Sequence, residues 1–135
     1  MNNNLAKLPD AIKLNWVDSY APQWIVPYLR LSRMDRPIGT WLLLIPCLWG
    51  LCLGIIESGS EFGLYQLRIA ICCGFGAILM RGAGCTWNDI NDQSVDAKVE
   101  RTRNRPIPSG QVTNKGALIW MSVQAIGSFI ILLSF

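Results

Sequence analysis

Residues 38–56 read IGTWLLLIPCLWGLCLGII, a run of nineteen positions without a charged side chain. A helix of this length matches the roughly 20 residues that span a hydrocarbon layer about 30 Å thick. Residues 116–135 form another uncharged run, of twenty positions. Between the two, residues 62–87 are apolar and carry only Arg68 and Arg81 as charges. The pattern predicts an all-α integral membrane bundle with spans at about 37–56, 62–88 and 116–135.

The composition of the 135 residues agrees with a membrane protein, since 51% are hydrophobic and 16% are charged. Twelve Lys and Arg against nine Asp and Glu leave a net charge of +3, so nucleic acid is not an expected partner. The sequence has no histidine, which excludes Ser-His-Asp triads and zinc sites that contain histidine. Chemistry must therefore use carboxylates, amides, Arg, Lys, Tyr or thiols.

Basic residues outside the spans predict the orientation, because Lys and Arg mark the cytoplasmic side of a membrane. They gather before the first span and after the second, and two spans return the chain to its starting side. Residues 1–36 are expected to be a cytoplasmic region without a targeting signal, a solvated arm over 1–20 followed by an interfacial segment. That segment is read equally well as a short surface helix or as an irregular lead-in. The membrane domain then covers residues 37–135.

A polar cytoplasmic segment, residues 88–115, follows the second span and opens with an acidic cluster. If the helix continues, about 100° per residue brings four oxygen-bearing side chains to one face. These are Asn88, Asp89, Asp92 and Asp96. Carboxylates on one stripe repel each other, and a hard divalent cation relieves the repulsion. Mg²⁺ is the expected ion because it takes oxygen ligands and keeps positions open for substrate phosphates.

Arg81 lies seven residues before Asn88 and within about 20° of the same stripe. An arginine inside a membrane helix is expensive facing lipid, so it should face a protein or water-filled cavity. Guanidinium groups bind phosphate bidentately and keep their charge. A cation with a guanidinium beneath it is therefore suited to a phosphate ester.

Three other interpretations of this region remain open. The acidic cluster is also compatible with a solvated loop next to the membrane. Residues 89–100 have the length of a calcium loop, although Ser94 stands where the sharp turn requires glycine. Arg101 and Arg105 are also explained as charges that only set the topology.

Three parts of the sequence resemble the UbiA-type intramembrane prenyltransferases. Asn88-Asp-x-x-Asp92-x-x-x-Asp96, followed by Arg101-Thr-x-x-Arg105-Pro, is similar to the first aspartate-rich motif of that family. Residues 80–85 precede the motif as they do in the family, and residues 33–39 resemble the entry to its first helix. Within the family, the pattern is most similar to the branch that prenylates 4-hydroxybenzoate in ubiquinone biosynthesis, more than to the haem O, menaquinone or chlorophyll branches.

The resemblance implies that Mg²⁺ on the motif binds the diphosphate of a polyprenyl donor, whose departure leaves an allylic cation for the ring of 4-hydroxybenzoate to attack. Expected metal ligands are Asn88, Asp89, Asp92 and Asp96. Expected catalytic residues are Asp92, Asp96 and Arg81. Expected substrate-binding residues are Arg33, Arg81, Arg101 and Arg105. Membrane lipid surrounds the chain, and the expected location is a bacterial inner (cytoplasmic) membrane, with the mitochondrial inner membrane as the alternative.

Members of the family have about nine membrane helices and a second aspartate-rich motif, whereas this sequence contains three spans and one motif. The chain is therefore expected to be a fragment without transferase activity on its own. The alternatives are a UbiA-type enzyme with another acceptor, a non-catalytic membrane subunit that binds a cation on its acidic stripe, and a scaffold in a lipid-synthesis complex. Membrane phosphatidyl-alcohol transferases do not fit, because their motif opens with Asp-Gly.

Overall fold

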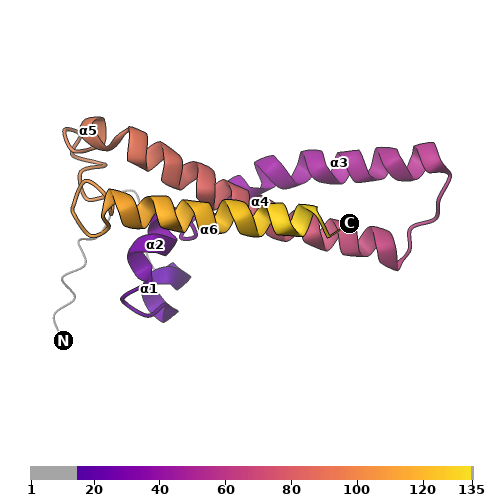
Figure 1. Cartoon of the computed structure of the whole chain (residues 1–135), viewed down its shortest axis with the longest axis horizontal. Helices are drawn as coiled ribbons and strands as arrows, with labels where there is room; N and C mark the ends of the chain where they lie inside the picture. The colour runs from indigo at the N-terminus through magenta and orange to yellow at the C-terminus, as the bar shows by residue number, and fades with distance from the viewer. Residues whose placement is uncertain (1–14, 135) are drawn as a thin grey trace.

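The computed structural model describes residues 15–134, which form helices and connecting loops without any strand. Three long helices, α3 (Trp41–Ser58), α4 (Leu64–Asn91) and α6 (Asn114–Leu132), run along the molecule. Figure 1 shows the three helices along the long axis of the molecule, and α4 packs against both of the others. Four short helices complete the structure: α1 (Trp16–Tyr20), α2 (Val26–Leu31), the 3-10 helix η1 (Pro37–Thr40) and α5 (Gln93–Asp96). The predicted all-α bundle is confirmed.

Three helical segments are long and apolar enough to cross a membrane: Pro37–Ser58, Leu64–Asn91 and Asn114–Leu132. They coincide with the three predicted spans to within a few residues at most ends. α3 buries none of its residues inside the structure. An outer surface this apolar is suited to lipid or to other apolar helices.

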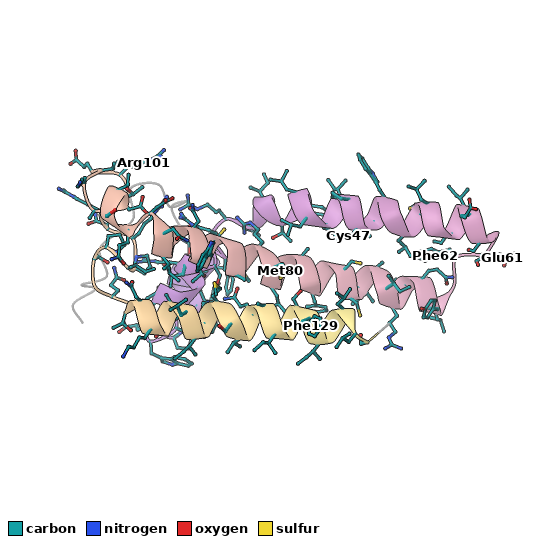
Figure 2. The ribbon with its side chains drawn as sticks, turned by 45° about the horizontal axis from the view of Figure 1, so that its top comes forward. Cys47, Glu61, Phe62, Met80, Arg101 and Phe129 are labelled. Atoms are coloured by element: carbon teal, nitrogen blue, oxygen red, sulfur yellow. The ribbon has the colours of Figure 1, made fainter. Side chains whose placement is uncertain are left out.

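The polar segments gather at one end of the bundle. Figure 2 shows Arg101 at this end and the short connector with Glu61 and Phe62 at the opposite end. A small core lies just inside the polar end, where α2, the loop before α6 and the first turns of α6 meet. Its buried residues are Leu31, Ile107, Val112 and Ala117.

The region before α2 differs from the predicted solvated arm. Residues 1–14 lie outside the described residues, and within residues 15–20 only Asn15 and Val17 are buried. Val17 of α1 is fully buried, and Asp18 forms an ion pair with Arg30 of α2 at 3.0 Å. Trp16 Nε1 donates a hydrogen bond to the Met34 carbonyl at 2.9 Å. This indole and this ion pair attach α1 to α2 and to the turn after it, so residues 15–20 do not form a separate arm. The following segment contains the short helix α2, and its place at the membrane surface stays a prediction.

Helices α4 and α6 approach closely where α4 carries Gly82. A Cβ on this residue would overlap Gln124 Oε1 of α6 and lie 3.1 Å from Ser32 Cβ. Ser32 Oγ accepts hydrogen bonds from Gln124 Nε2 at 2.9 Å and from Trp120 Nε1 at 2.8 Å. These contacts fasten the turn that follows α2 to the middle of the bundle.

Candidate functional site

The turn after α2 holds Arg33 in an uncommon backbone conformation. Arg33 has φ 55°, and it is the one residue other than glycine with positive φ within residues 15–134. Its N–H donates to the Arg30 carbonyl at 3.1 Å, and the N–H of Met34 donates to the Leu29 carbonyl at 3.0 Å. This is a Schellman motif, in which the left-handed position usually belongs to glycine. An arginine there costs about 1–2 kcal/mol, so other contacts must hold it in place.

Arg81 supplies one of these contacts from within α4. Its Nη1 donates to the Arg33 carbonyl at 3.1 Å and its Nη2 to the Arg36 carbonyl at 2.8 Å. Gly39 makes room for the guanidinium, because a Cβ there would lie 2.6 Å from Arg81 Nε. The guanidinium thus faces the turn, as the cost of exposure to lipid requires. Its role as a diphosphate ligand stays a prediction.

The side chain of Arg33 reaches Asp89 near the end of α4. Arg33 Nη2 donates to Asp89 Oδ1 at 2.7 Å. Arg105, from the loop before α6, donates from Nη1 to the same oxygen at 3.3 Å and to Asp96 Oδ2 at 2.7 Å. Arg33, Asp89, Asp96 and Arg105 are here called the arginine–aspartate cluster. The cluster joins segments that precede and follow α4 in the sequence.

The arginine–aspartate cluster is largely enclosed. The side chain of Asp89 is 1% exposed, and those of Arg33 and Arg105 are 13% and 14% exposed. Two of its buried atoms, Asp89 Oδ2 and Arg105 Nε, have no hydrogen-bond partner among the described residues. A buried polar atom without a partner costs about 1–3 kcal/mol, and such atoms mark positions for a ligand or an ordered water.

The acidic segment is divided at Asp92. α4 ends at Asn91, and Asp92, with φ −88° and ψ 3°, separates it from α5. The condition under which the four oxygen-bearing side chains share one face, a helix that continues through Asp96, is therefore not met. Asn88 Nδ2 donates to Asp92 Oδ2 at 2.8 Å in an exposed pair, whereas Asp89 and Asp96 are buried on Arg105.

A magnesium ion fits the exposed pair better than the buried carboxylates. The amide nitrogen of Asn88 is bonded to Asp92, so the amide oxygen and the remaining carboxylate lone pairs are available at the surface. Mg²⁺ is commonly held by one or two carboxylates together with water and substrate phosphate. No three Asp, Glu or Cys side chains within residues 15–134 converge on one point as metal ligands. The predicted set of four ligands therefore stays a prediction.

The loop between α5 and α6 places its arginines differently. Arg105 is buried in the arginine–aspartate cluster, as described above. Arg101 is exposed and forms no ion pair with another of the described residues. Arg103 approaches Glu100 at 3.7 Å, and both side chains are mostly exposed, so this pair contributes little to stability.

Sequence reasoning missed several residues that shape the site. Gln124 carried a usable signal, because a polar side chain inside a membrane span is costly unless it has a partner. Ser32 and Gly39 carried none, since their roles depend on which side chains the fold brings beside them. Asp35, which is 4% exposed and forms an ion pair with Arg36 at 2.9 Å, was also missed.

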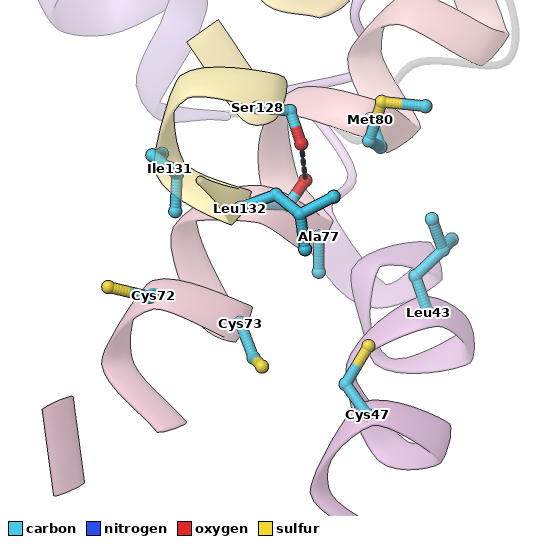
Figure 3. A pocket seen from close by; sticks show the side chains of 10 residues that line it. Leu43, Cys47, Cys72, Cys73, Ala77, Met80, Ser128, Ile131 and Leu132 are labelled. Atoms are coloured by element: carbon cyan, nitrogen blue, oxygen red, sulfur yellow. Dashed lines mark hydrogen bonds between the residues drawn. The ribbon is translucent and has the colours of Figure 1, made fainter. Parts of the chain in front are cut away.

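An apolar cavity of about 190 Å³ lies between α3, α4 and α6. Figure 3 shows side chains from the three helices around it, with Ser128 Oγ donating to the Gly76 carbonyl at 3.5 Å. Met80, which lines the cavity, directly precedes Arg81 in α4. Along α4 the cavity therefore extends as far as the residue before Arg81. Its lining includes Leu43, Cys47, Cys73, Ala77, Met80 and Leu132.

Comparison with known proteins identifies relatives. Residues 43–135 match the UbiA prenyltransferase family. The chain is 46% identical over 120 residues to 4-hydroxybenzoate polyprenyltransferase, mitochondrial, of Dictyostelium discoideum, covering 89% of this chain and 25% of that protein. The identically named proteins of Homo sapiens and Saccharomyces cerevisiae are 50% and 40% identical over 108 residues, which is 80% of this chain and 28% and 29% of theirs. The chain thus spans about a quarter of the length of these relatives. No solved structure matches it.

Proposed function

Because this chain belongs to the UbiA prenyltransferase family, we propose that it serves the transfer of a polyprenyl group from polyprenyl diphosphate to the ring of 4-hydroxybenzoate in ubiquinone synthesis. The donor, the acceptor and the activity are inferred from the names of the relatives. The observation that carries the proposal is the arginine–aspartate cluster, in which Arg33 and Arg105 meet on Asp89 at the end of an apolar helix.

In this proposal the two arginines bind the diphosphate. Each guanidinium has five N–H donors, and the described contacts with carboxylates use only some of them. Arg105 Nε is buried and has no hydrogen-bond partner among the described residues, so this donor is unused in the absence of a phosphate. Arginine pairs with phosphate oxygens through charge-assisted hydrogen bonds, which are about twice as strong as neutral ones.

Asn88 and Asp92 would hold Mg²⁺, whereas Asp96 is buried against Arg105 and would act through that arginine. When bound, Mg²⁺ supplies positive charge that stabilises the departing diphosphate. Arg33 and Arg105 add to that stabilisation from fixed positions, so little reorganisation is needed as charge develops. Arg81 acts through Arg33, since its guanidinium is bonded to the carbonyl of that residue.

The proposed reaction breaks the bond between the allylic carbon and the diphosphate oxygen, and the diphosphate leaves with the electron pair. The ring carbon beside the hydroxyl of 4-hydroxybenzoate bonds to the allylic cation, and the ring then loses a proton. Apolar surroundings keep water from the cation. The cavity next to Met80 offers an apolar surface for the prenyl tail.

The membrane that houses the chain is also part of the proposal. The relatives are named mitochondrial, whereas the expected location was a bacterial inner membrane with the motif facing the cytoplasm. We propose an inner membrane in either case. The arginine–aspartate cluster would lie on the side of the membrane where the diphosphate head group of the donor meets the aqueous phase. Fractionation of the source cells, with protease accessibility of the 97–113 loop, tests both location and orientation.

Binding of the donor by the chain itself is the first test. The chain in lipid nanodiscs should bind farnesyl diphosphate in the presence of Mg²⁺, and Arg105→Gln should weaken binding at least about tenfold through the loss of charge-assisted hydrogen bonds. Arg103→Gln is the matched control, because Arg103 is exposed in the same loop. Equal affinities of the two variants would overturn the proposal.

The acceptor needs a separate test. The matching segment of the Saccharomyces cerevisiae relative can be replaced by the 108 residues of this chain that align with it, and ubiquinone can be measured in yeast that lacks its own enzyme. Restored synthesis, lost again with Arg105→Gln, would support 4-hydroxybenzoate as acceptor. A chimera that is present in the membrane and produces no prenylated 4-hydroxybenzoate would contradict it.

A further inference from the structure

We propose that Asp89 is a positioning residue for Arg33 and Arg105 and does not bind the metal, although it belongs to the acidic motif. The inference rests on the proposed function, because it assigns a role within the same diphosphate site. It divides the motif into an exposed half, Asn88 and Asp92, and a buried half, Asp89 and Asp96, that serves arginine.

The contacts of Asp89 exclude a cation from the same oxygen. Its Oδ1 accepts from Arg33 Nη2 at 2.7 Å and from Arg105 Nη1 at 3.3 Å. A divalent ion on this carboxylate would lie within a few ångströms of two guanidinium groups. The repulsion would be large because the side chain is 1% exposed and water cannot screen it.

The shared oxygen explains how two like charges stay close together. Two guanidinium groups that donate to one atom repel each other, and the carboxylate between them offsets that repulsion. Asp89 Oδ2 has no partner among the described residues, so it is a second acceptor. Either arginine can then shift onto it when an anion arrives and still keep its counter-charge. The carboxylate thus holds an anion site ready in the absence of the anion.

The backbone of Arg33 supports the same role. This residue keeps its left-handed conformation, φ 55°, while Arg81 holds its carbonyl and Asp89 holds its side chain. A strained residue persists when its surroundings over-determine it. Without the carboxylate, the guanidinium of Arg33 would lose its fixed position and be free to turn toward solvent.

The test separates metal binding from diphosphate binding. Mn²⁺ replaces Mg²⁺ as a probe, and its affinity for the chain in nanodiscs is measured by electron paramagnetic resonance. The affinity for inorganic diphosphate is then measured at saturating Mn²⁺ and 0.15 M salt, where the Debye length of about 8 Å limits the effect of net charge. The variants are Asp89→Asn and Asp92→Asn, with Glu61→Gln in the distant connector as the control.

We expect Asp89→Asn to bind Mn²⁺ within about twofold of wild type and diphosphate about tenfold more weakly, because the arginines are no longer pre-organised. Asp92→Asn should show the reverse, with Mn²⁺ affinity reduced at least about tenfold. Glu61→Gln should match wild type in both. A loss of Mn²⁺ in Asp89→Asn equal to that in Asp92→Asn would overturn the inference, as would unchanged or tighter diphosphate binding. A parallel loss of both ligands would indicate a merely structural role and also overturn it.

Should Asp89→Asn not fold, the double variant Asp89→Asn/Arg33→Gln removes one charge of each sign and leaves Arg105 paired with Asp96. The inference expects this variant to keep its Mn²⁺ affinity, whereas a metal ligand at Asp89 requires that the affinity fall. The outcome for the proposed function is distinct. A wild-type chain that binds Mn²⁺ but no diphosphate overturns the proposed function, and this inference falls with it.

Discussion

Replacing Arg33 should destabilise the chain by an amount that depends on the replacement. Removing one partner of a buried ion pair costs about 3–5 kcal/mol. Asp89 keeps Arg105 at 3.3 Å, so we expect the lower end for Arg33→Ala, about 3 kcal/mol. Alanine at φ 55° retains the strain of the left-handed conformation, whereas glycine does not. Arg33→Gly should therefore be about 1 kcal/mol more stable than Arg33→Ala.

Equilibrium unfolding in mixed micelles, with increasing dodecyl sulfate and circular dichroism as the signal, measures these differences. Arg103→Ala and Arg103→Gly serve as controls, because Arg103 is exposed and its ion pair is weak. Both controls should lie within about 1 kcal/mol of wild type, since surface substitutions have small effects. If Arg33→Gly is less stable than Arg33→Ala, the Schellman turn is wrong. If Arg33→Ala is as stable as wild type, the ion pair with Asp89 does not support the fold.

Three further substitutions test neighbouring contacts. Gly39→Ala places a Cβ 2.6 Å from Arg81 Nε, so the guanidinium must move away from the turn. We expect a lower melting temperature and severalfold weaker diphosphate binding. An unchanged melting temperature and affinity would refute this packing. Ser32→Ala leaves the buried Gln124 amide without its acceptor and should lower the free energy of unfolding in micelles by about 1–3 kcal/mol. An unchanged free energy of unfolding would contradict this hydrogen bond. Ala77→Phe fills the cavity and should weaken binding of long polyprenyl diphosphates while inorganic diphosphate binds as before. An equal loss of affinity for both ligands would show that the prenyl tail does not bind in this cavity.

The sequence predicted the architecture well because membrane spans are encoded locally. A run such as residues 38–56 is apolar at every position, and no distant contact is needed to recognise it. The family followed from short motifs for the same reason. The bounds of α4 were harder to predict, since its last turn is polar and its end at Asn91 depends on the backbone of Asp92.

The arginine–aspartate cluster could be predicted only in part. Asp89 and Arg105 were both recognised as site residues, but their pairing depends on the path of the 97–113 loop. Arg33 is fifty-six residues from Asp89 in sequence and reaches it through a turn in which arginine replaces the usual glycine. Local propensity predicts against that conformation. The partners of Arg81 are backbone carbonyls, which carry no signal in the sequence.

The arrangement also explains why a single helix can position the whole site. Arg81 and Asp89 lie eight residues apart on α4, which corresponds to about 12 Å along a helix axis. Arg81 fixes the backbone of the Arg33 turn, and Asp89 fixes its side chain. Two points on one rigid element therefore determine the position and the direction of Arg33, and Asp89 also places Arg105. Side chains held by helices are positioned more precisely than side chains held by loops alone. Here α4 fixes the positions of the loop residues.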